Sequence, residues 1–94
     1  MANALKIHPK DNVVVALCDL EEGIPLELSD SSMDLTVTSQ EAIPFGHKVA
    51  IANIARGQPV IKYGTSIGVA TDDVRPGEHV HVHNLRSVRG AARS

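Results

Sequence analysis

Residues 78–84 have the composition and spacing expected of a metal-binding strand. Their sequence is Glu-His-Val-His-Val-His-Asn, so the histidines are His79, His81 and His83 and the valines between them are Val80 and Val82. Alternate side chains of an extended strand point to opposite faces, which places the histidines in one row and directs the valines into the core. Neutral imidazoles suit Zn, Fe, Ni or Cu, and Glu78 offers a supplementary oxygen. The row therefore predicts a metal site, with a solvated strand face as the competing interpretation.

A second group of reactive side chains follows a predicted turn at Gly46. His47 and Lys48 stand at the start of the next apolar run, and a glycine can adopt the positive φ that a tight turn requires. Histidine titrates near neutral pH and suits acid–base catalysis, while a lysine beside it can bind a carboxylate. His47 and Lys48 are therefore candidates for acid–base chemistry or for binding a carboxylate. The alternative is that one of His47 and Lys48 caps the turn while the other is solvated.

Lys62 and Tyr63, in the apolar run that ends before Gly64, form a third group of polar side chains. If residues 60–63 form a strand, the side chains of Lys62 and Tyr63 point to opposite faces and cannot line one pocket. A bend at Gly64 would bring them together, since a glycine in a strand often marks a bulge or a close backbone approach. The alternative is structural, with Lys62 exposed and Tyr63 covering the sheet.

Strands must position these side chains, because the apolar residues of the chain are mostly β-branched. Leu, Ile and Val total 25, of which 18 are Val or Ile, whereas Phe and Tyr occur once each and Trp is absent. Stiff β-branched side chains pack well on a pleated sheet. Turn residues divide the apolar runs into expected strands at 5–8, 12–18, 24–28, 35–38, 47–54, 60–63, 67–70 and 78–84. The pattern predicts an all-β fold, a compact small barrel or clip of short strands with little or no helix, in one domain over residues 1–85.

Two other parts of the chain are not expected to carry chemistry. Cys18 ends the run 12–18, which is nearly continuously apolar and therefore reads as a fully buried strand, so we predict a buried, inert thiol. Residues 86–94 are small and basic, and we expect them to form a disordered tail.

The composition excludes several classes of protein. A formal net charge of -2 does not match a nucleic-acid-binding domain, which would be basic. No apolar run approaches the roughly 20 residues of a membrane span, and a single cysteine excludes an internal disulfide framework. We expect a cytoplasmic protein that binds neither nucleic acid nor membrane.

Four sequence blocks, in this order, resemble one known domain. They are KIHPKDNVVVAL at 6–17, GHKVAI at 46–51, VIKYG at 60–64 with Ile67 and Gly68, and GEHVHVHN at 77–84. The chain resembles, over about residues 5–85, the SAF domain that forms the N-terminal domain or small subunit in the altronate dehydratase–galactarate dehydratase family. It is also similar to the small subunit of sulfolactate sulfo-lyase. The resemblance implies a β-clip fold.

The resemblance also implies a share in eliminating water from a 2,3-dihydroxy sugar acid, which gives a 2-keto-3-deoxy acid. A divalent metal, commonly Fe²⁺ in this family, would stabilise the developing negative charge. Lys48 and Lys62 would help to hold the carboxylate, with Tyr63 as the third candidate substrate-binding residue. A histidine would protonate the departing hydroxyl. The resemblance thus makes His47, Lys48 and His81 the candidate catalytic residues. In the full-length dehydratases a catalytic region of several hundred residues follows this domain. We therefore expect a separate large catalytic subunit as partner, a small sugar acid as substrate, and an isolated chain that is inactive.

Two alternatives stay open at this point. One is the small subunit of sulfolactate sulfo-lyase or of another 2-hydroxy-acid lyase. The other is a non-catalytic SAF binding module, which would bind no metal. The sequence leaves the oligomeric state open, a homo-oligomer included.

Overall fold

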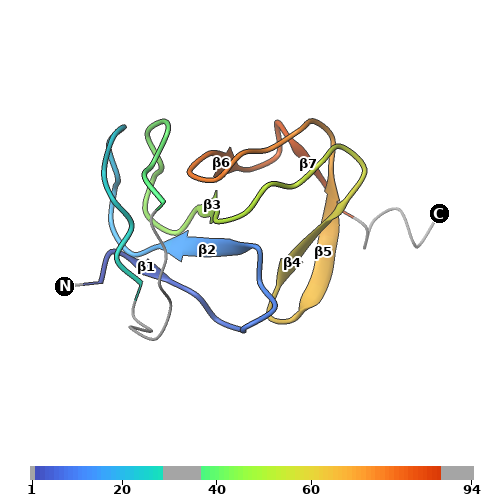
Figure 1. Ribbon diagram of the computed structural model, residues 1–94, viewed down its shortest axis with the longest axis horizontal. Helices are drawn as coiled ribbons and strands as arrows, with labels where there is room; N and C mark the ends of the chain where they lie inside the picture. The colour runs from blue at the N-terminus through green and yellow to red at the C-terminus, as the bar shows by residue number, and fades with distance from the viewer. Residues whose placement is uncertain (1, 29–36, 88–94) are drawn as a thin grey trace.

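Seven short strands form two antiparallel sheets in the computed structural model, which describes residues 2–28 and 37–87 (Figure 1). The strands are β1 (Ala4–Leu5), β2 (Val13–Ala16), β3 (Lys48–Ala50), β4 (Pro59–Lys62), β5 (Thr65–Ala70), β6 (His79–Val80) and β7 (Leu85–Arg86). One sheet has the order β1-β2-β3-β6 and the other has the order β4-β5-β7. No helix occurs among the described residues. The predicted all-β fold, a small SAF-like β-clip, is confirmed.

The four-stranded sheet is covered on both faces, which explains why β2 reads as a continuous apolar run. Val14 pairs with Val49, and both lie in one hydrophobic cluster. Val13 pairs with Ala50, and both lie in a second cluster, which also takes in Val60 of the other sheet. Adjacent residues of one strand face opposite sides, so consecutive valines are buried in different cores.

A single turn motif, which we call the apolar–glycine motif, recurs four times among the described residues. An apolar residue is followed three positions later by a glycine with positive φ, at Leu20/Gly23, Ile43/Gly46, Ile54/Gly57 and Val74/Gly77. The apolar residues bridge in pairs, Leu20 with Ile43 and Ile54 with Val74. The three-residue spacing between the apolar residue and the glycine is visible in the sequence, but the predicted turns did not use it.

Several predicted strands are shorter in the structure than in the sequence pattern. The expected strands 5–8 and 47–54 correspond to β1 and β3. The segment 24–28 contributes only isolated bridges, at Pro25 and Leu28. Residues 29–36 lie outside the described part of the chain, so the expected strand 35–38 is described only at Val37 and Thr38.

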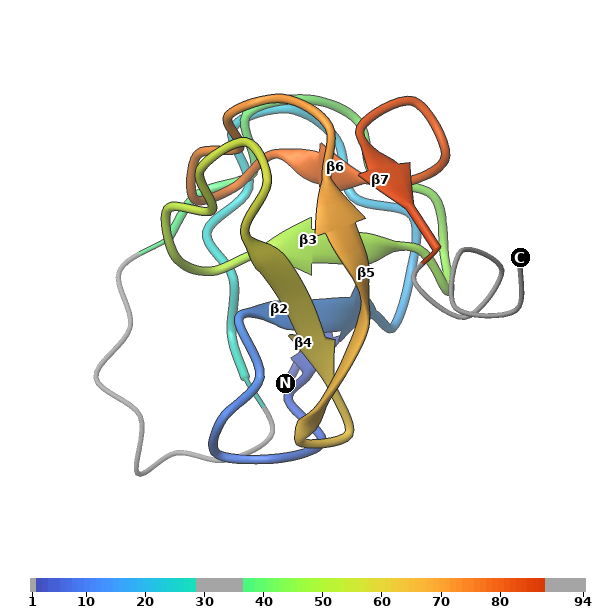
Figure 2. The same ribbon diagram turned by 90° about the vertical axis from the view of Figure 1, so that its right-hand side faces the viewer.

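The C-terminal strand differs most from its prediction. Instead of one strand over 78–84, the chain forms β6, turns, and enters the second sheet as β7 (Figure 2). Val80 is fully buried as expected, but Val82 is 81% exposed, so the prediction that it faces the core is wrong. The reason is the turn, which ends the alternation of faces after Val80. Arg86, assigned from the sequence to the tail, lies in β7, and residues 88–94 lie outside the described residues.

The expectation for Cys18 is also wrong. The thiol is exposed, because β2 ends at Ala16 and the chain leaves the core at Leu17. The apolar run continues in the sequence beyond the strand that it forms. The described residues also include no helix with the length and apolar character needed to cross a membrane.

Candidate functional site

A tight turn carries His47 to the start of β3, beside the edge strand β6 of the four-stranded sheet. The backbone N–H of His47 donates to the carbonyl oxygen of Pro44 (3.0 Å), and the N–H of Gly46 donates to Ala16 (2.9 Å). The turn leads directly into β3, which pairs with β6 so that Val49 lies opposite His79. His47 and His79 thereby start from neighbouring strands, although 32 positions separate them in the sequence.

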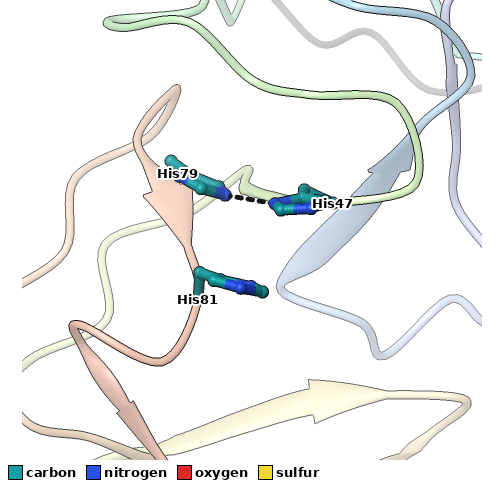
Figure 3. Close-up of side chains that lie close together, drawn as sticks. All are labelled: His47, His79 and His81. Atoms are coloured by element: carbon teal, nitrogen blue, oxygen red, sulfur yellow. Dashed lines mark hydrogen bonds between the residues drawn. The ribbon is translucent and has the colours of Figure 1, made fainter.

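Three imidazoles meet at this edge, as Figure 3 shows. Nδ1 of His47 lies 2.8 Å from Nε2 of His79. The ring centroid of His81 lies 4.4 Å from that of His47 and 5.3 Å from that of His79. One nitrogen from each ring lies within 4.8 Å of the others, and all three residues are half-buried. We call His47, His79 and His81 the histidine cluster.

His83 remains at the margin of this cluster. Its ring centroid is 5.4 Å from that of His79 and its plane is tilted by 45°. The residue is exposed and does not belong to the group of converging nitrogens. The structure thus unites His79 and His81, expected as ligands, with His47, expected as a catalytic residue.

Asn84 fixes the turn that places His81. Its side-chain oxygen accepts from the backbone N–H of His81 (2.9 Å), and its side-chain NH₂ donates to the carbonyl oxygen of His79 (2.8 Å). The residue is 7% exposed, so these bonds are shielded from water. Sequence analysis missed this role, but an asparagine after a polar run is a known signal for a turn closed by its side chain.

The environment of His79 and His81 favours neutral imidazoles. Partial burial, and then the neighbouring charges of His47, His83 and His81, lower the pKa of His79, against the opposing effect of Glu41. Partial burial also lowers the pKa of His81, and His47 and Lys48 add to the effect. A neutral imidazole presents a lone pair, which is the form that binds a transition metal.

Carboxylates play a supporting part around the cluster. Glu78, expected as a supplementary ligand, uses Oε1 to accept from the backbone N–H of Arg75 (2.8 Å) within its own turn. Glu41, by contrast, contacts a residue of the cluster: its Oε2 accepts from the backbone N–H of His79 (3.1 Å).

Lys48 and Lys62 bring two positive charges to the same region. Lys48 is half-buried, and this burial, together with the charge of Lys62, lowers the pKa of its ammonium group. Lys48 pairs with Val80 across β3 and β6, so its side chain shares a face of the sheet with Val80. This face looks towards the second hydrophobic cluster and β4.

Lys62 and Tyr63 meet at a hairpin turn. Tyr63 has a φ of 59° and Gly64 a φ of 73°, so the chain reverses between β4 and β5. Nζ of Lys62 lies 4.9 Å from the centroid of the Tyr63 ring. The bend considered at Gly64 therefore exists and brings the two side chains together, whereas a continuous strand would have separated them.

The loop before β2 holds this hairpin in place. Asp11, 4% exposed, accepts from the backbone N–H of Gly64 (2.8 Å) through one carboxylate oxygen and from that of His8 (3.0 Å) through the other. Asn12 accepts from the N–H of Ile61 (2.8 Å). Sequence analysis used this segment only as part of a resemblance, because bonds to residues about 50 positions away leave no local pattern.

The donor set fits a divalent transition metal. Metal–imidazole bonds of roughly 2.0–2.1 Å need nitrogens about 3–4 Å apart. In the cluster the nitrogens of His47 and His79 are 2.8 Å apart, and all three lie within 4.8 Å of one another. All three donors are imidazoles, and the environment of His79 and His81 favours the neutral form. Such a set suits Zn, Fe, Ni or Cu better than Mg or Ca.

Comparison with known proteins gives the same two groups that the sequence blocks suggested. The family model described as "Altronate/galactarate dehydratase SAF domain" matches residues 2–88. An altronate dehydratase of Escherichia coli (strain K12) is 47% identical over 83 residues, which cover 88% of this chain and 16% of that protein. An altronate dehydratase of Bacillus subtilis (strain 168) is 38% identical over 87 residues, which cover 93% of this chain and 17% of that protein. A (2R)-sulfolactate sulfo-lyase subunit alpha of Chromohalobacter salexigens is 39% identical over 87 residues, which cover 88% of this chain and 93% of that subunit. The chain thus spans less than a fifth of the two altronate dehydratases and most of the sulfo-lyase subunit.

Proposed function

Because the chain belongs to the altronate/galactarate dehydratase SAF domain family, we propose that it is the SAF component of a sugar-acid dehydratase. It acts with a large catalytic subunit to eliminate water from a 2,3-dihydroxy acid, giving a 2-keto-3-deoxy acid. The observation that carries this proposal is the meeting of His47 with His79 and His81 beside Lys48. Neither sequence block could form this group alone.

The two lysines are assigned to the substrate carboxylate. The charge of Lys62 already lowers the pKa of Lys48, so the pair repels in the absence of an anion. A carboxylate between them would remove this repulsion and gain charge-assisted hydrogen bonds. Tyr63, next to Lys62, is assigned to a hydroxyl group of the same substrate.

The histidine cluster is assigned to a divalent cation, Fe²⁺ in this proposal. When bound, the cation supplies a Lewis acid that stabilises the charge developing as the α-proton leaves. The three imidazoles would hold it through their ring nitrogens, and Asn84 keeps His81 in place. A competing role for His47 and His81 is protonation of the departing hydroxyl.

A second candidate function has its own support. The sulfo-lyase subunit of Chromohalobacter salexigens is matched over 93% of its length, so a protein of about this size occurs as a subunit in that lyase. A sulfonate, like a carboxylate, is an oxyanion that paired lysines bind. A lyase acting on sulfolactate or a similar 2-hydroxy acid would use the same groups of this chain.

Reconstitution tests these functions. The chain is combined with the large catalytic subunit from the same source, and elimination is measured on altronate, galactarate and sulfolactate, with and without added Fe²⁺. We expect turnover of a sugar acid only when both polypeptides are present, and loss of turnover in His81→Ala. Full turnover by the large subunit alone would overturn the catalytic role and leave a binding module, whereas turnover of sulfolactate alone would select the second candidate.

A further inference from the structure

The aromatic residues of this chain are placed unusually for a small globular protein. Phe45 and Tyr63 are the only aromatic residues among Phe, Tyr and Trp, and they are 66% and 59% exposed. The core is built from Val, Ile, Leu and Ala instead. An exposed aromatic ring is a common anchor of a protein–protein interface, because it buries a large apolar area with few rotatable bonds.

These exposed side chains lie beside the candidate site. Phe45 belongs to the turn that delivers His47, and Tyr63 contacts Lys62. Val82, 81% exposed, lies within the turn that carries His81. We call the surface of Phe45 and Val82, together with the histidine cluster, the histidine face.

The backbone presents these apolar groups in fixed positions. The turn around Val82 is closed by the two side-chain hydrogen bonds of Asn84. Tyr63 has a φ of 59°, a conformation that is uncommon for a bulky residue. The buried carboxylate of Asp11 secures the neighbouring Gly64. The hydrogen bonds and backbone conformations of the turns therefore hold these apolar side chains in exposed positions.

The surface next to Phe45 also contains a recess. A hollow of about 320 Å³ is lined by residues that include Leu20, Ile43 and Pro44, the residue before Phe45. This recess can accommodate an apolar side chain from another protein.

From these features we infer that the histidine face is the surface on which the catalytic subunit docks, an inference that rests on the proposed function. The partner surface is apolar opposite Phe45 and Val82. The two altronate dehydratases contain more than four-fifths of their length beyond the part matched here, enough chain to cover this face. The site would then be closed between the two polypeptides.

Affinity measurements on matched serine variants test the inference. The chain is titrated into the large catalytic subunit in a calorimeter, as wild type, Phe45→Ser, Val82→Ser and Leu5→Ser. Leu5 is the control, because it is also exposed (36%) but lies on β1, at the edge of the sheet opposite β6. We expect Phe45→Ser and Val82→Ser each to weaken binding roughly 10-fold or more, and Leu5→Ser to bind within about twofold of wild type. Urea unfolding of each variant confirms that the chain remains folded.

The outcomes separate the interface from the function. Loss of affinity in the two variants with no turnover of any tested acid would support the interface and overturn the proposed function. Turnover by the wild-type complex with unchanged affinity in both variants would overturn the interface and leave the function standing. Failure of the wild-type polypeptides to associate, or an equal loss of affinity in Leu5→Ser, would also overturn the interface.

Discussion

His47 turns a row of histidines into a three-sided group. A strand alone presents imidazoles in a line, two residues apart, and a line offers an ion at most two of them at once. The turn at Gly46 brings His47 to within 2.8 Å of His79, from the neighbouring strand. At the scale of single residues, the site is therefore a contact between two turns as much as a property of one strand.

Replacement of single histidines should divide them into two classes. His47→Ala, His79→Ala and His81→Ala should weaken Fe²⁺ or Zn²⁺ binding by more than the roughly 10–100-fold typical of losing an outer-shell group. His83→Ala, outside the cluster, should retain nearly the wild-type affinity. Calorimetry and metal analysis of the chain measure this directly. If His81 instead acts only as a proton donor, His81→Ala will keep the ion while the reconstituted enzyme loses turnover.

The lowered pKa values of His79 and His81 predict how stability depends on pH. Unfolding returns both groups towards the ordinary value of 6.5, so the unfolded chain binds more protons below that pH. Stability from these groups is therefore complete above pH 6.5 and declines as the pH falls through 6.5 towards their lower folded values. Urea unfolding of the metal-free chain at pH 7.5 and pH 5.5 measures the decline, which His79→Gln/His81→Gln should reduce. An unchanged decline in this variant would assign it to other groups.

Strand β6 illustrates, at the scale of elements, what periodicity can and cannot predict. Alternation correctly placed Val80 in the core and His79 on the opposite face. It failed at Val82, because side-chain hydrogen bonds of Asn84 close a turn that no hydrophobic pattern encodes. The partner of the row, His47, was recognised as reactive, but its contact with His79 depends on the pairing of β3 with β6, which a local pattern does not specify.

The same contrast holds for the hairpin between β4 and β5. Gly64 marked the bend in the sequence, so the meeting of Lys62 with Tyr63 was foreseeable. The support from Asp11 was not, since a buried carboxylate bonded to a distant backbone N–H has the local sequence of an ordinary polar loop.

Removal of the Asn84 side chain should affect both stability and the site. Asn84→Ala loses the acceptor of the His81 N–H and leaves the carbonyl of His79 without its donor, in a buried position. We expect a loss of about 1–3 kcal/mol in the free energy of unfolding, measured in urea. Metal affinity should fall as well, because His81 is no longer held. Asn53→Ala, at an exposed position, is the matched control and should leave both quantities nearly unchanged.

The apolar–glycine motif occurs at four turns across the described part of the molecule, and its apolar residues bridge in pairs. Two of its turns offer a matched comparison, because Gly57 and Gly77 have nearly the same φ, 87° and 91°. A Cβ at Gly57 would meet nothing within 4 Å, whereas a Cβ at Gly77 would overlap the carbonyl oxygen of Thr38. The N–H of Gln40 also donates to the carbonyl of Gly77 (2.8 Å), so this turn is packed against another segment.

Alanine at these two positions should therefore have different effects. Gly57→Ala bears only the conformational cost of positive φ, about 1–2 kcal/mol. Gly77→Ala adds an overlap with backbone, typically about 1–3 kcal/mol more. Unfolding in urea measures both, and equal losses would show that the contact between residue 77 and Thr38 is not held in solution.

The 32 positions between His47 and His79 have a consequence for the life of the protein in the cell. An unfolded polypeptide does not hold these rings together, so an ion seated among them would bind the native chain alone. At a free concentration one hundred times its dissociation constant, such an ion adds about 2.7 kcal/mol to the folding equilibrium. Removal of such an ion would then lower the free energy of unfolding by the same amount and expose more of the chain to proteases.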